Sequence, residues 1–261
     1  MSNDSWIDNE EIKKLPNGVA ISWGFIKQSK RGPKGELSID KIVEAAVQIA
    51  DQDGLGAVSM NRVAASLGFT PMSLYRYITS KDDLLVLMQE AICKLDIPPL
   101  DDSIGWREEM RQYVQTCIYI FNKHPWFGDI PVSGIPLTPN NLVFVDWGLR
   151  TMRHFPLSDY EKMSFILLLS SYARSVGIIS ADFTKAIQSG VNPETINGSY
   201  YTGALKQLVT KERYPYLAPL VESGAYTEDQ EQESDTINDF DFGLERILDG
   251  IEHYLNHGQS K

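Results

Sequence analysis

The sequence predicts an all-α protein with two parts, an N-terminal helix-turn-helix three-helix domain and a larger helical domain after it. Apolar residues recur three and four positions apart along most of the 261 residues. No stretch alternates apolar and polar residues over the length of a strand. Residues 59–81 carry the end signals of two short helices joined by a tight turn. We expect an extension at residues 1–26, the first domain at 27–86 and the second at 87–261.

Composition places the chain among globular proteins with a sizeable core. Its length and its 43% hydrophobic content suit one small and one medium domain. Cys93 and Cys117 are too few for a disulfide framework, which favours a reducing cytoplasm. The acidic N-terminus lacks the apolar core of a signal peptide, and the longest apolar run, residues 165–169, is too short to cross a bilayer. We therefore expect a soluble protein with no membrane partner.

The N-terminal extension has no structure that the sequence assigns, although its aromatic residues indicate that parts of it pack. A basic arm follows, KQSKRGPKG at residues 27–35, in which glycine and proline oppose regular structure. Flexible basic arms beside a helix-turn-helix can lie in the adjacent minor groove, and a solvated linker is the alternative. The candidate DNA contacts in the arm are Lys30 and Arg31.

The first helix is expected at residues 39–53. Ser38 is a good N-cap, and Gly54 stands where a helix commonly ends. An apolar stripe at spacings of three and four predicts one buried face. The stripe consists of Ile42, Val43, Ala46, Ile49 and Ala50.

Residues 59–81 then read as two short helices. Ser59 caps a helix at residues 60–67, and Gly68 follows it, where a left-handed residue ends a helix without steric cost. Thr70 caps the next helix and Pro71 takes its first position, where proline loses no needed N–H group. This arrangement is typical of the helix-turn-helix, whose second helix enters the DNA major groove.

A fourth helix begins after Ser80, where Asp83 completes a capping-box-like pattern, and is expected to run towards Leu95. Because it joins the first domain to the second, any signal between them must tilt or shift it. Residues 226–241 carry seven acidic and no basic residues, which predicts a mobile solvated loop. Further helices are expected at residues 106–123, 139–154, 158–188, 200–211 and 237–257.

The last of these helices has an apolar seam with alternating spacings of four and three residues, the a and d rhythm of helix packing. Such a seam can pair with a symmetry-related copy or form an ordinary core face. We favour a homodimer, because a helix-turn-helix reader needs two half-sites for specificity. The predicted interface residues are Phe240, Leu244, Ile247, Ile251 and Tyr254.

From about residue 37 to 88 the chain resembles the tetracycline-repressor (TetR) family of bacterial transcription regulators. The resemblance rests on IVEAAVQIADQDGL, VSMNRVAASLGFTPMSLYRYI and SKDDLL. HPW at residues 124–126 and PNN at 139–141 look like the C-terminal ligand-binding and dimerisation domain of that family. The resemblance implies a repressor of a palindromic double-stranded DNA operator, released by a small-molecule effector. It also implies a four-helix dimer interface built from the final helix and the helix beginning near residue 158.

The predicted DNA contacts gather on the outward face of the second short helix, since Leu74 and Ile78 point to the core. Arg76 suits a guanine edge or a phosphate, and Met72 suits only an apolar contact. The resemblance implies that Tyr75 and Tyr77 reach phosphates, while many relatives carry arginine in place of Asn61. The alternative is that the arginines only solubilise the surface. The full set is Ser59, Asn61, Arg62, Thr70, Pro71, Met72, Ser73, Tyr75, Arg76, Tyr77 and Lys81.

The net charge of −11 opposes DNA binding unless the positive charge is local. Residues 27–81 carry eight basic and five acidic side chains, a net charge of +3, and the remainder carries −14. Phosphate attraction decays over about 8–10 Å at physiological salt, so the local patch decides binding. We expect the acidic remainder to keep the affinity for random DNA modest.

The effector site is predicted from aromatic side chains on three helices of the second domain. A pocket needs apolar walls with a few polar groups, and this composition suits a planar or hydrophobic effector. Arg174 is a candidate partner for an effector carboxylate, or a residue that meets an acidic neighbour. A plain aromatic core is the alternative for each position. The candidates are Tyr113, Cys117, Phe121, Trp126, Phe144, Trp147, Leu168 and Tyr172.

Catalysis is not expected. His253 and His257 have the spacing of a metal pair but lack the HExxH glutamate, and no nucleophile elbow or phosphate-binding glycine loop is present. We therefore expect no metal and no cofactor. The alternative to a DNA-binding regulator is a helical protein–protein adaptor, which would leave the basic arm and Arg76 without a role.

Overall fold

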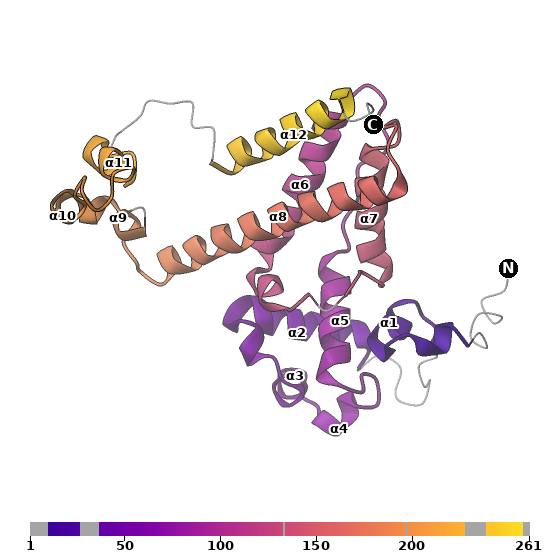
Figure 1. The fold of residues 1–261 in the computed structure, drawn as a ribbon. Helices are drawn as coiled ribbons and strands as arrows, with labels where there is room; N and C mark the ends of the chain where they lie inside the picture. The colour runs from indigo at the N-terminus through magenta and orange to yellow at the C-terminus, as the bar shows by residue number, and fades with distance from the viewer. Residues whose placement is uncertain (1–9, 27–36, 133, 197, 228–238, 258–261) are drawn as a thin grey trace. The chain divides into compact units, whose positions relative to one another are not determined.

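The structure is a computed structural model that describes residues 10–26, 37–132, 134–196, 198–227 and 239–257. Within these ranges it contains helices and turns and no strand, so the predicted all-α class is confirmed (Figure 1). The chain divides into two compact units, Met1–Ile178 and Ile179–Lys261. The division falls inside one long helix.

The first unit begins with a short helical segment that the sequence left unassigned. It comprises the 3₁₀ helix η2 (Ile12–Lys14) and α1 (Asn17–Ser22). Helix α1 packs against α5 (Lys81–Ile92), beside which it lies in Figure 1. The buried residues of α1 are Gly18, Val19 and Ala20. The aromatic residue Trp23 follows the helix and is 41% exposed, so the packing of α1 does not come from the aromatic residues that the sequence singled out.

The predicted first helix is confirmed as α2 (Ile39–Asp53). The Ser38 side chain accepts a hydrogen bond from the Lys41 amide, and Gly54 ends the helix with φ of 80°. Ile42 and Ala46 are fully buried, as the apolar stripe predicted. A 3₁₀ turn, η3 (Leu55–Ala57), leads on to the next helix.

Two short helices follow, α3 (Met60–Ser66) and α4 (Pro71–Leu74). Gly68 has φ of 75°, the left-handed conformation expected at the turn. Regular α-helix ends at Leu74, earlier than the pattern suggested. The next turn stays helical in part, because the Ile78 amide still donates to the Leu74 carbonyl.

Helix α5 starts as predicted, since the Ser80 side chain accepts from the Asp83 amide at 3.0 Å and donates to its carboxylate at 2.7 Å. The expected end at Leu95 is wrong, because the helix stops at Ile92, before two prolines at 98 and 99. The domain boundary expected at residues 86–87 falls in the middle of α5. Residues 37–92 are called the reader below, and the described residues from 93 to 178 are called the body.

The body of the first unit is built from long helices whose predicted ranges hold within a few residues. Glycines allow close packing between them. A side chain at Gly148 would meet Ile166 and Tyr113, and one at Gly177 would meet Phe121. The elements are α6 (Trp106–Lys123), η4 (Pro125–Asp129), α7 (Pro139–Thr151) and α8 (Asp159–Gln188).

Helix α7 ends at Thr151 instead of the predicted residue 154. Arg153 leaves the helix, and its guanidinium donates to Glu109 at 2.5 Å and to Asp102 at 3.1 Å. By length and composition alone, α8 is apolar enough to span a membrane, which the five-residue apolar run did not suggest.

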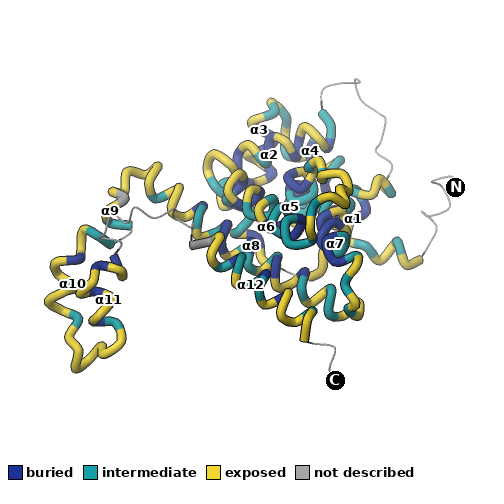
Figure 2. The backbone as a smooth tube through the Cα atoms, turned by 90° about the horizontal axis from the view of Figure 1, so that it is seen from above, coloured by how far each residue is buried: buried dark blue, intermediate teal, exposed yellow. Residues whose placement is uncertain are grey.

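The second unit contains the end of α8, a set of short helical segments that are mostly exposed (Figure 2), and the longer helix α12. The helix predicted at residues 200–211 is shorter, because a 3₁₀ turn replaces its start. The predicted loop at residues 226–241 lies largely outside the described residues, and its last three residues are helical. The elements are α9 (Pro193–Ile196), η5 (Ser199–Tyr201), α10 (Thr202–Leu208), α11 (Ala218–Ser223) and α12 (Asp239–His257).

Candidate nucleic-acid interface and effector site

Helix α4 and the turn that follows it present several of the side chains that the sequence nominated for DNA contact. Leu74 and Ile78 are fully buried, whereas Met72 is 70% exposed and Tyr75 is 45% exposed. Arg76 is exposed beside them, and within the described residues it has no ion-pair partner. Residues 71–78 are thus held to the core by Leu74 and Ile78, while their opposite face is exposed to solvent and accessible to DNA.

Thr70 and Pro71 stand at the start of α4 as predicted, but the capping role of Thr70 is wrong. Its side chain makes no cap hydrogen bond to the backbone. Its hydroxyl instead lies 3.0 Å from the Ser73 hydroxyl, so the two side chains satisfy each other. Tyr77 is half-buried, with its amide donating to the Leu74 carbonyl.

The start of α3 supplies the flanking candidates. Ser59 accepts a hydrogen bond from the Arg62 amide at 3.2 Å, which confirms it as the N-cap. Asn61 and Arg62 are exposed. The Arg62 guanidinium forms an ion pair with Asp53 at the end of α2, which offsets the charge that Arg62 would offer a phosphate. The arm residues Lys30 and Arg31 lie outside the described residues.

Lys81 is exposed at the N-terminus of α5, and within the described part of the chain it has no ion-pair partner. The turn beneath it is organised by Asp83. Burial raises the pKa of the Asp83 carboxyl, but hydrogen bonds from Thr79, Ser80 and the Gly18 amide outweigh burial and hold that pKa below its ordinary value. The carboxylate therefore stays ionised and keeps this end of the helix fixed.

The reader is joined to the body through the HPW motif. The Trp126 indole N–H donates to the Asp51 carboxylate at 2.6 Å, and His124 Nδ1 lies 2.8 Å from the same oxygen. Asp51 is in the last turn of α2, and the two aromatic residues flank the start of η4. Sequence reasoning singled out HPW but missed Asp51, since nothing in the pattern of α2 distinguishes it from other polar residues.

The other end of η4 is held by α8. The Arg174 guanidinium donates to the carbonyl oxygens of Gly128 at 2.7 Å and Ile130 at 3.0 Å, and it lies 5.8 Å from the centre of the Phe121 ring. Arg174 therefore binds backbone, and the acidic neighbour considered for it is absent from these contacts. A continuous set of contacts thus runs from α8 through η4 to α2.

A second connection links α5 to the PNN motif. Both oxygens of the Glu90 carboxylate lie 3.0 Å from the Asn140 amide nitrogen, and the Asn140 side chain donates to the Glu90 carbonyl at 3.0 Å. Glu90 therefore caps α7, whose N-cap residue Thr138 makes no such bond through its own side chain. No sequence pattern predicts this pairing, because the two partners come from different helices.

The predicted effector residues mostly form packed core. Tyr113 and Trp147 meet edge to face with ring centres 5.5 Å apart, and Phe121 stacks on Phe127 at 4.9 Å. Leu168 is 46% exposed, so it faces away from this core. Cys117 and Tyr172 are half-buried. The buried candidates are Tyr113, Phe121, Trp126, Phe144 and Trp147.

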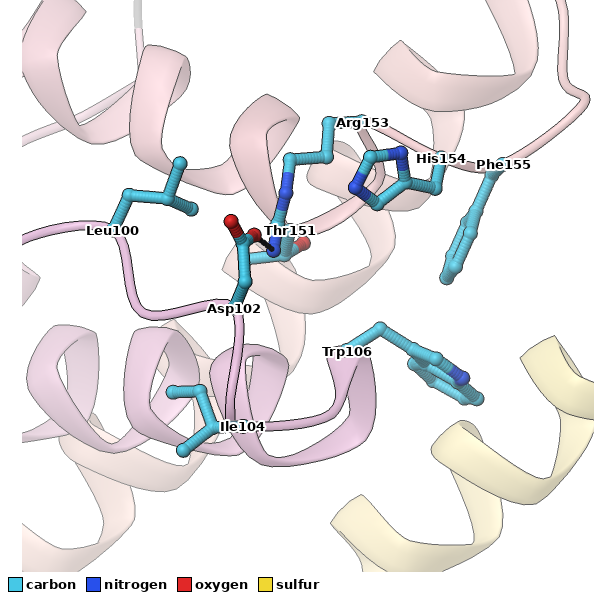
Figure 3. Close-up of a pocket in the computed structure, with 8 residues that line it drawn as sticks. All are labelled: Leu100, Asp102, Ile104, Trp106, Thr151, Arg153, His154 and Phe155. Atoms are coloured by element: carbon cyan, nitrogen blue, oxygen red, sulfur yellow. Dashed lines mark hydrogen bonds and ion pairs between the residues drawn. The ribbon is translucent and has the colours of Figure 1, made fainter.

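A pocket of about 450 Å³ lies elsewhere in the first unit, between the chain entering α6 and the chain leaving α7 (Figure 3). Trp106 and Phe155 line one side, with ring centres 5.3 Å apart. The Arg153 guanidinium donates a hydrogen bond to the Asp102 carboxylate at the pocket, so the positive charge of Arg153 already has an acidic partner. The lining residues are Leu100, Asp102, Ile104, Trp106, Thr151, Arg153, His154 and Phe155, none of which the sequence nominated.

The predicted dimer seam on α12 is partly buried within the single chain. Leu244 and Ile251 are 2% and 1% exposed. Ile247 is half-buried, Tyr254 is 40% exposed, and the side chain of Phe240 lies outside the described residues.

The two cysteines and the pair of histidines near the C-terminus were the side chains considered for catalysis or metal binding. Burial raises the pKa of the Cys93 and Cys117 thiols to about 12 each, so both are protonated at neutral pH. The rings of His253 and His257 stack with centres 4.2 Å apart. Among the described residues no group of three or more metal-ligating side chains is present.

Comparison with known proteins agrees with this architecture. The family profile "Bacterial regulatory proteins, tetR family" matches residues 42–88, and "Tetracyclin repressor-like, C-terminal domain" matches residues 98–255. The HTH-type transcriptional repressor DrrR1 of Streptomyces coeruleorubidus is 34% identical over 253 residues, covering 90% of this chain and 84% of the relative.

Solved structures give the same assignment. ActR, a TetR family protein of Streptomyces coelicolor, matches in its apo form with 24% identity and a TM-score of 0.69, covering 87% of this chain and 100% of ActR. Its complex with actinorhodin matches with 25% identity and a TM-score of 0.68, covering 85% of this chain and 98% of ActR. The chain therefore belongs to the TetR family of bacterial regulatory proteins and is a DNA-binding transcription regulator with a helix-turn-helix reader.

Proposed function

We propose that the chain is a cytoplasmic, homodimeric transcriptional repressor that leaves a palindromic operator when a small hydrophobic or aromatic effector binds its C-terminal domain. The observation that carries this proposal is the exposed surface of α4 and the turn after it, where Met72, Tyr75 and Arg76 are exposed and Leu74 is buried. Repression is favoured over activation because DrrR1 is described as a repressor.

Dimerisation is supported by an exposed apolar stripe on α8. Tyr160 is 82% exposed, Met163 47% and Leu167 68%, at helical spacings that place them on one face. A large exposed apolar patch marks an interaction surface. A membrane would also accept this helix by composition. We favour a second copy of the chain as the partner of this α8 stripe. A palindromic operator has two half-sites, and a dimer places one reader on each of them.

The effector part rests on the aromatic core of the body. Tyr113, Phe144 and Trp147 come from α6 and α7, and a planar molecule that enters between them must displace one helix from the other. Both helices are tied to the reader, α6 through the adjoining η4 and Asp51, and α7 through Glu90. ActR, which shares 25% identity, has been solved with actinorhodin, so actinorhodin is a sensible first compound to test.

The experiment begins with selection of binding sites for the purified protein from a random DNA pool. The selected duplex is labelled and titrated in fluorescence anisotropy at two salt concentrations, with a scrambled duplex as control. We expect two chains per duplex, specific binding, and an affinity that falls as salt rises. Actinorhodin and other aromatic compounds are then added to the preformed complex and screened for release.

Equal, weak binding to every duplex would refute the DNA part of the proposal and favour the adaptor alternative. A compound that binds the protein tightly yet leaves the operator complex intact would refute release for that compound, because a ligand shifts only an equilibrium whose two states it binds differently. Fractionation of cells answers the membrane question, since a dimeric repressor stays in the soluble fraction.

A further inference from the structure

The segment at residues 10–26 precedes both regions that the family profiles match, yet it is fastened to the reader. The Gly18 amide donates to the Asp83 carboxylate at 2.8 Å in a buried contact. A Cβ at Gly18 would lie 2.9 Å from the Asp83 carbonyl oxygen and 3.0 Å from the Val86 Cβ. Because backbone atoms cannot move aside, only glycine lets α1 approach α5 this closely. Val19 and Ala20 are buried beside it.

The same segment is also fastened to the body. The Trp23 indole N–H donates to the Leu137 carbonyl at 2.8 Å, and the Trp23 ring stacks on Phe25 with ring centres 6.1 Å apart. Leu137 lies just before α7. At the reader end, the Asn17 side chain adds a hydrogen bond to the Thr79 hydroxyl at 3.0 Å. Residues 10–26 therefore span from the start of α5 to the start of α7.

Helix α5 is thus held at two points. At Asp83 it is held by α1, and at Glu90 by the start of α7. Seven residues of α-helix separate these points, a rise of about 10 Å. The Trp23 contact closes this arrangement, because it joins α1 to the chain that enters α7. A tilt of α5 relative to the body would stretch or break at least one of these contacts.

We propose that residues 10–26 form a brace that fixes the tilt of α5, with Gly18 and Trp23 as positioning residues for operator binding. This inference rests in part on the proposed function. Helix α5 carries Lys81 and continues from the recognition turn, so its tilt sets where the reader points. A reader that is already held in place loses less conformational freedom when both subunits engage one operator. The brace therefore raises operator affinity.

The test uses three full-length variants. Gly18→Val forces α1 away from α5, and Trp23→Phe removes the N–H donor while keeping a smaller aromatic ring. Lys13→Ala is the control in the same segment, since Lys13 is half-exposed and pairs only with exposed Glu10 in the described residues. Circular dichroism and thermal unfolding establish whether each variant is folded. If Gly18→Val does not fold, Trp23→Phe alone tests the proposal.

The first readout is hydrogen–deuterium exchange without DNA. We expect faster exchange in the amides of α5 and of residues 137–141 for Gly18→Val and Trp23→Phe, with α2 unchanged and Lys13→Ala identical to the parent. The second readout is affinity for the duplex selected by the parent protein. We expect both brace variants to bind it about 3- to 10-fold more weakly, the effect of one lost hydrogen bond, with the same salt dependence.

Unchanged exchange in α5 would overturn the brace itself. Faster exchange with equal or tighter operator binding would overturn its role in preparing the reader. If the parent protein selects no DNA sequence, the proposed function and the operator role both fall, while the exchange data still decide whether the brace exists. A loss of affinity accompanied by a lower salt slope would also contradict the proposal, because it would mean that the segment contacts phosphate directly.

Discussion

The Trp126 indole N–H and the Asp51 carboxylate meet at 2.6 Å across 75 residues of sequence. His124 shares the same carboxylate oxygen at 2.8 Å. Both aromatic side chains are buried, so Asp51 is the acceptor that makes their burial tolerable. This contact ties α2 of the reader to η4 of the body.

Asp51→Ala is expected to lower the free energy of unfolding by about 1–3 kcal/mol, because it leaves the buried Trp126 N–H without an acceptor. Urea unfolding followed by circular dichroism measures this. Asp53→Ala is the matched control on the same helix, since Asp53 pairs with the exposed Arg62, and an exposed pair contributes about 0–1 kcal/mol. Equal losses of unfolding free energy in the two variants would mean that the buried contact of Asp51 stabilises the protein no more than the exposed Asp53 pair does.

Arg76→Ala is expected to cost about 1–3 kcal/mol of operator affinity and to relax base preference at one position of each half-site. The reason is that Arg76 is exposed on the outward face of the helix-turn-helix and suits a bidentate contact with guanine. Anisotropy against a panel of single-base operator variants measures both effects. Arg213→Ala, an exposed arginine of the second unit, should bind like the parent protein. If Arg76→Ala kept the full base preference of the parent protein, Arg76 would not be a residue that contacts a base.

Much of the reader was predictable because its signals are local. Ser38, Ser59 and Gly68 act within one turn of their own positions, so single residues fix where helices begin and end. The positions of Leu74 and Ile78 follow from helical spacing in the same way. The outward face of α4 follows once those two residues are buried.

The contacts between distant segments could not be predicted, because their partners have no fixed sequence spacing. Asp51 with Trp126, Glu90 with Asn140 and Gly18 with Asp83 each join segments at least 50 residues apart. The effector residues were harder still, since apolar spacing on a helix predicts burial and does not distinguish a core from a pocket. Leu168 illustrates this, because its apolar character reflects an exposed face.

Lys81→Ala is expected to weaken binding to all DNA sequences alike and to lower the slope of log affinity against log salt by about one. Lys81 is exposed at the N-terminus of α5, where charge and helix dipole both attract phosphate. Titrations of selected and scrambled duplexes over a range of salt concentrations measure the slope. Lys206→Ala, exposed on α10, should leave it unchanged. A selective loss for one sequence would instead assign Lys81 to base contact.

Leu167→Glu is expected to convert the dimer to a monomer and to abolish tight operator binding, because it places a charge on the exposed apolar stripe of α8. Leu167 is 68% exposed in the single chain, so the change should not unfold the subunit. Size-exclusion chromatography with light scattering measures the mass. Leu208→Glu is the control, since Leu208 is 70% exposed on α10. A dimeric Leu167→Glu would move the interface away from this face of α8.

Acidification is expected to remove the stability that ionised Asp83 contributes. Hydrogen bonds hold the pKa of Asp83 in the folded protein below the ordinary value of 3.8, so the folded state favours the ionised form more than the unfolded state does. The contribution is therefore present in full above the unfolded pKa and is lost as pH falls through the folded one.

Asp83→Asn tests this effect, because the amide keeps the shape of the side chain and removes its charge, although it also replaces one acceptor oxygen by an NH2 donor. Urea unfolding should show the parent protein more stable than Asp83→Asn at neutral pH, with the difference shrinking below pH 3.8. Asp82→Asn, one residue away and exposed, should show no such difference. A difference between the parent protein and Asp83→Asn that stays constant as pH falls would mean that hydrogen-bond geometry, and not the charge of Asp83, holds the start of α5.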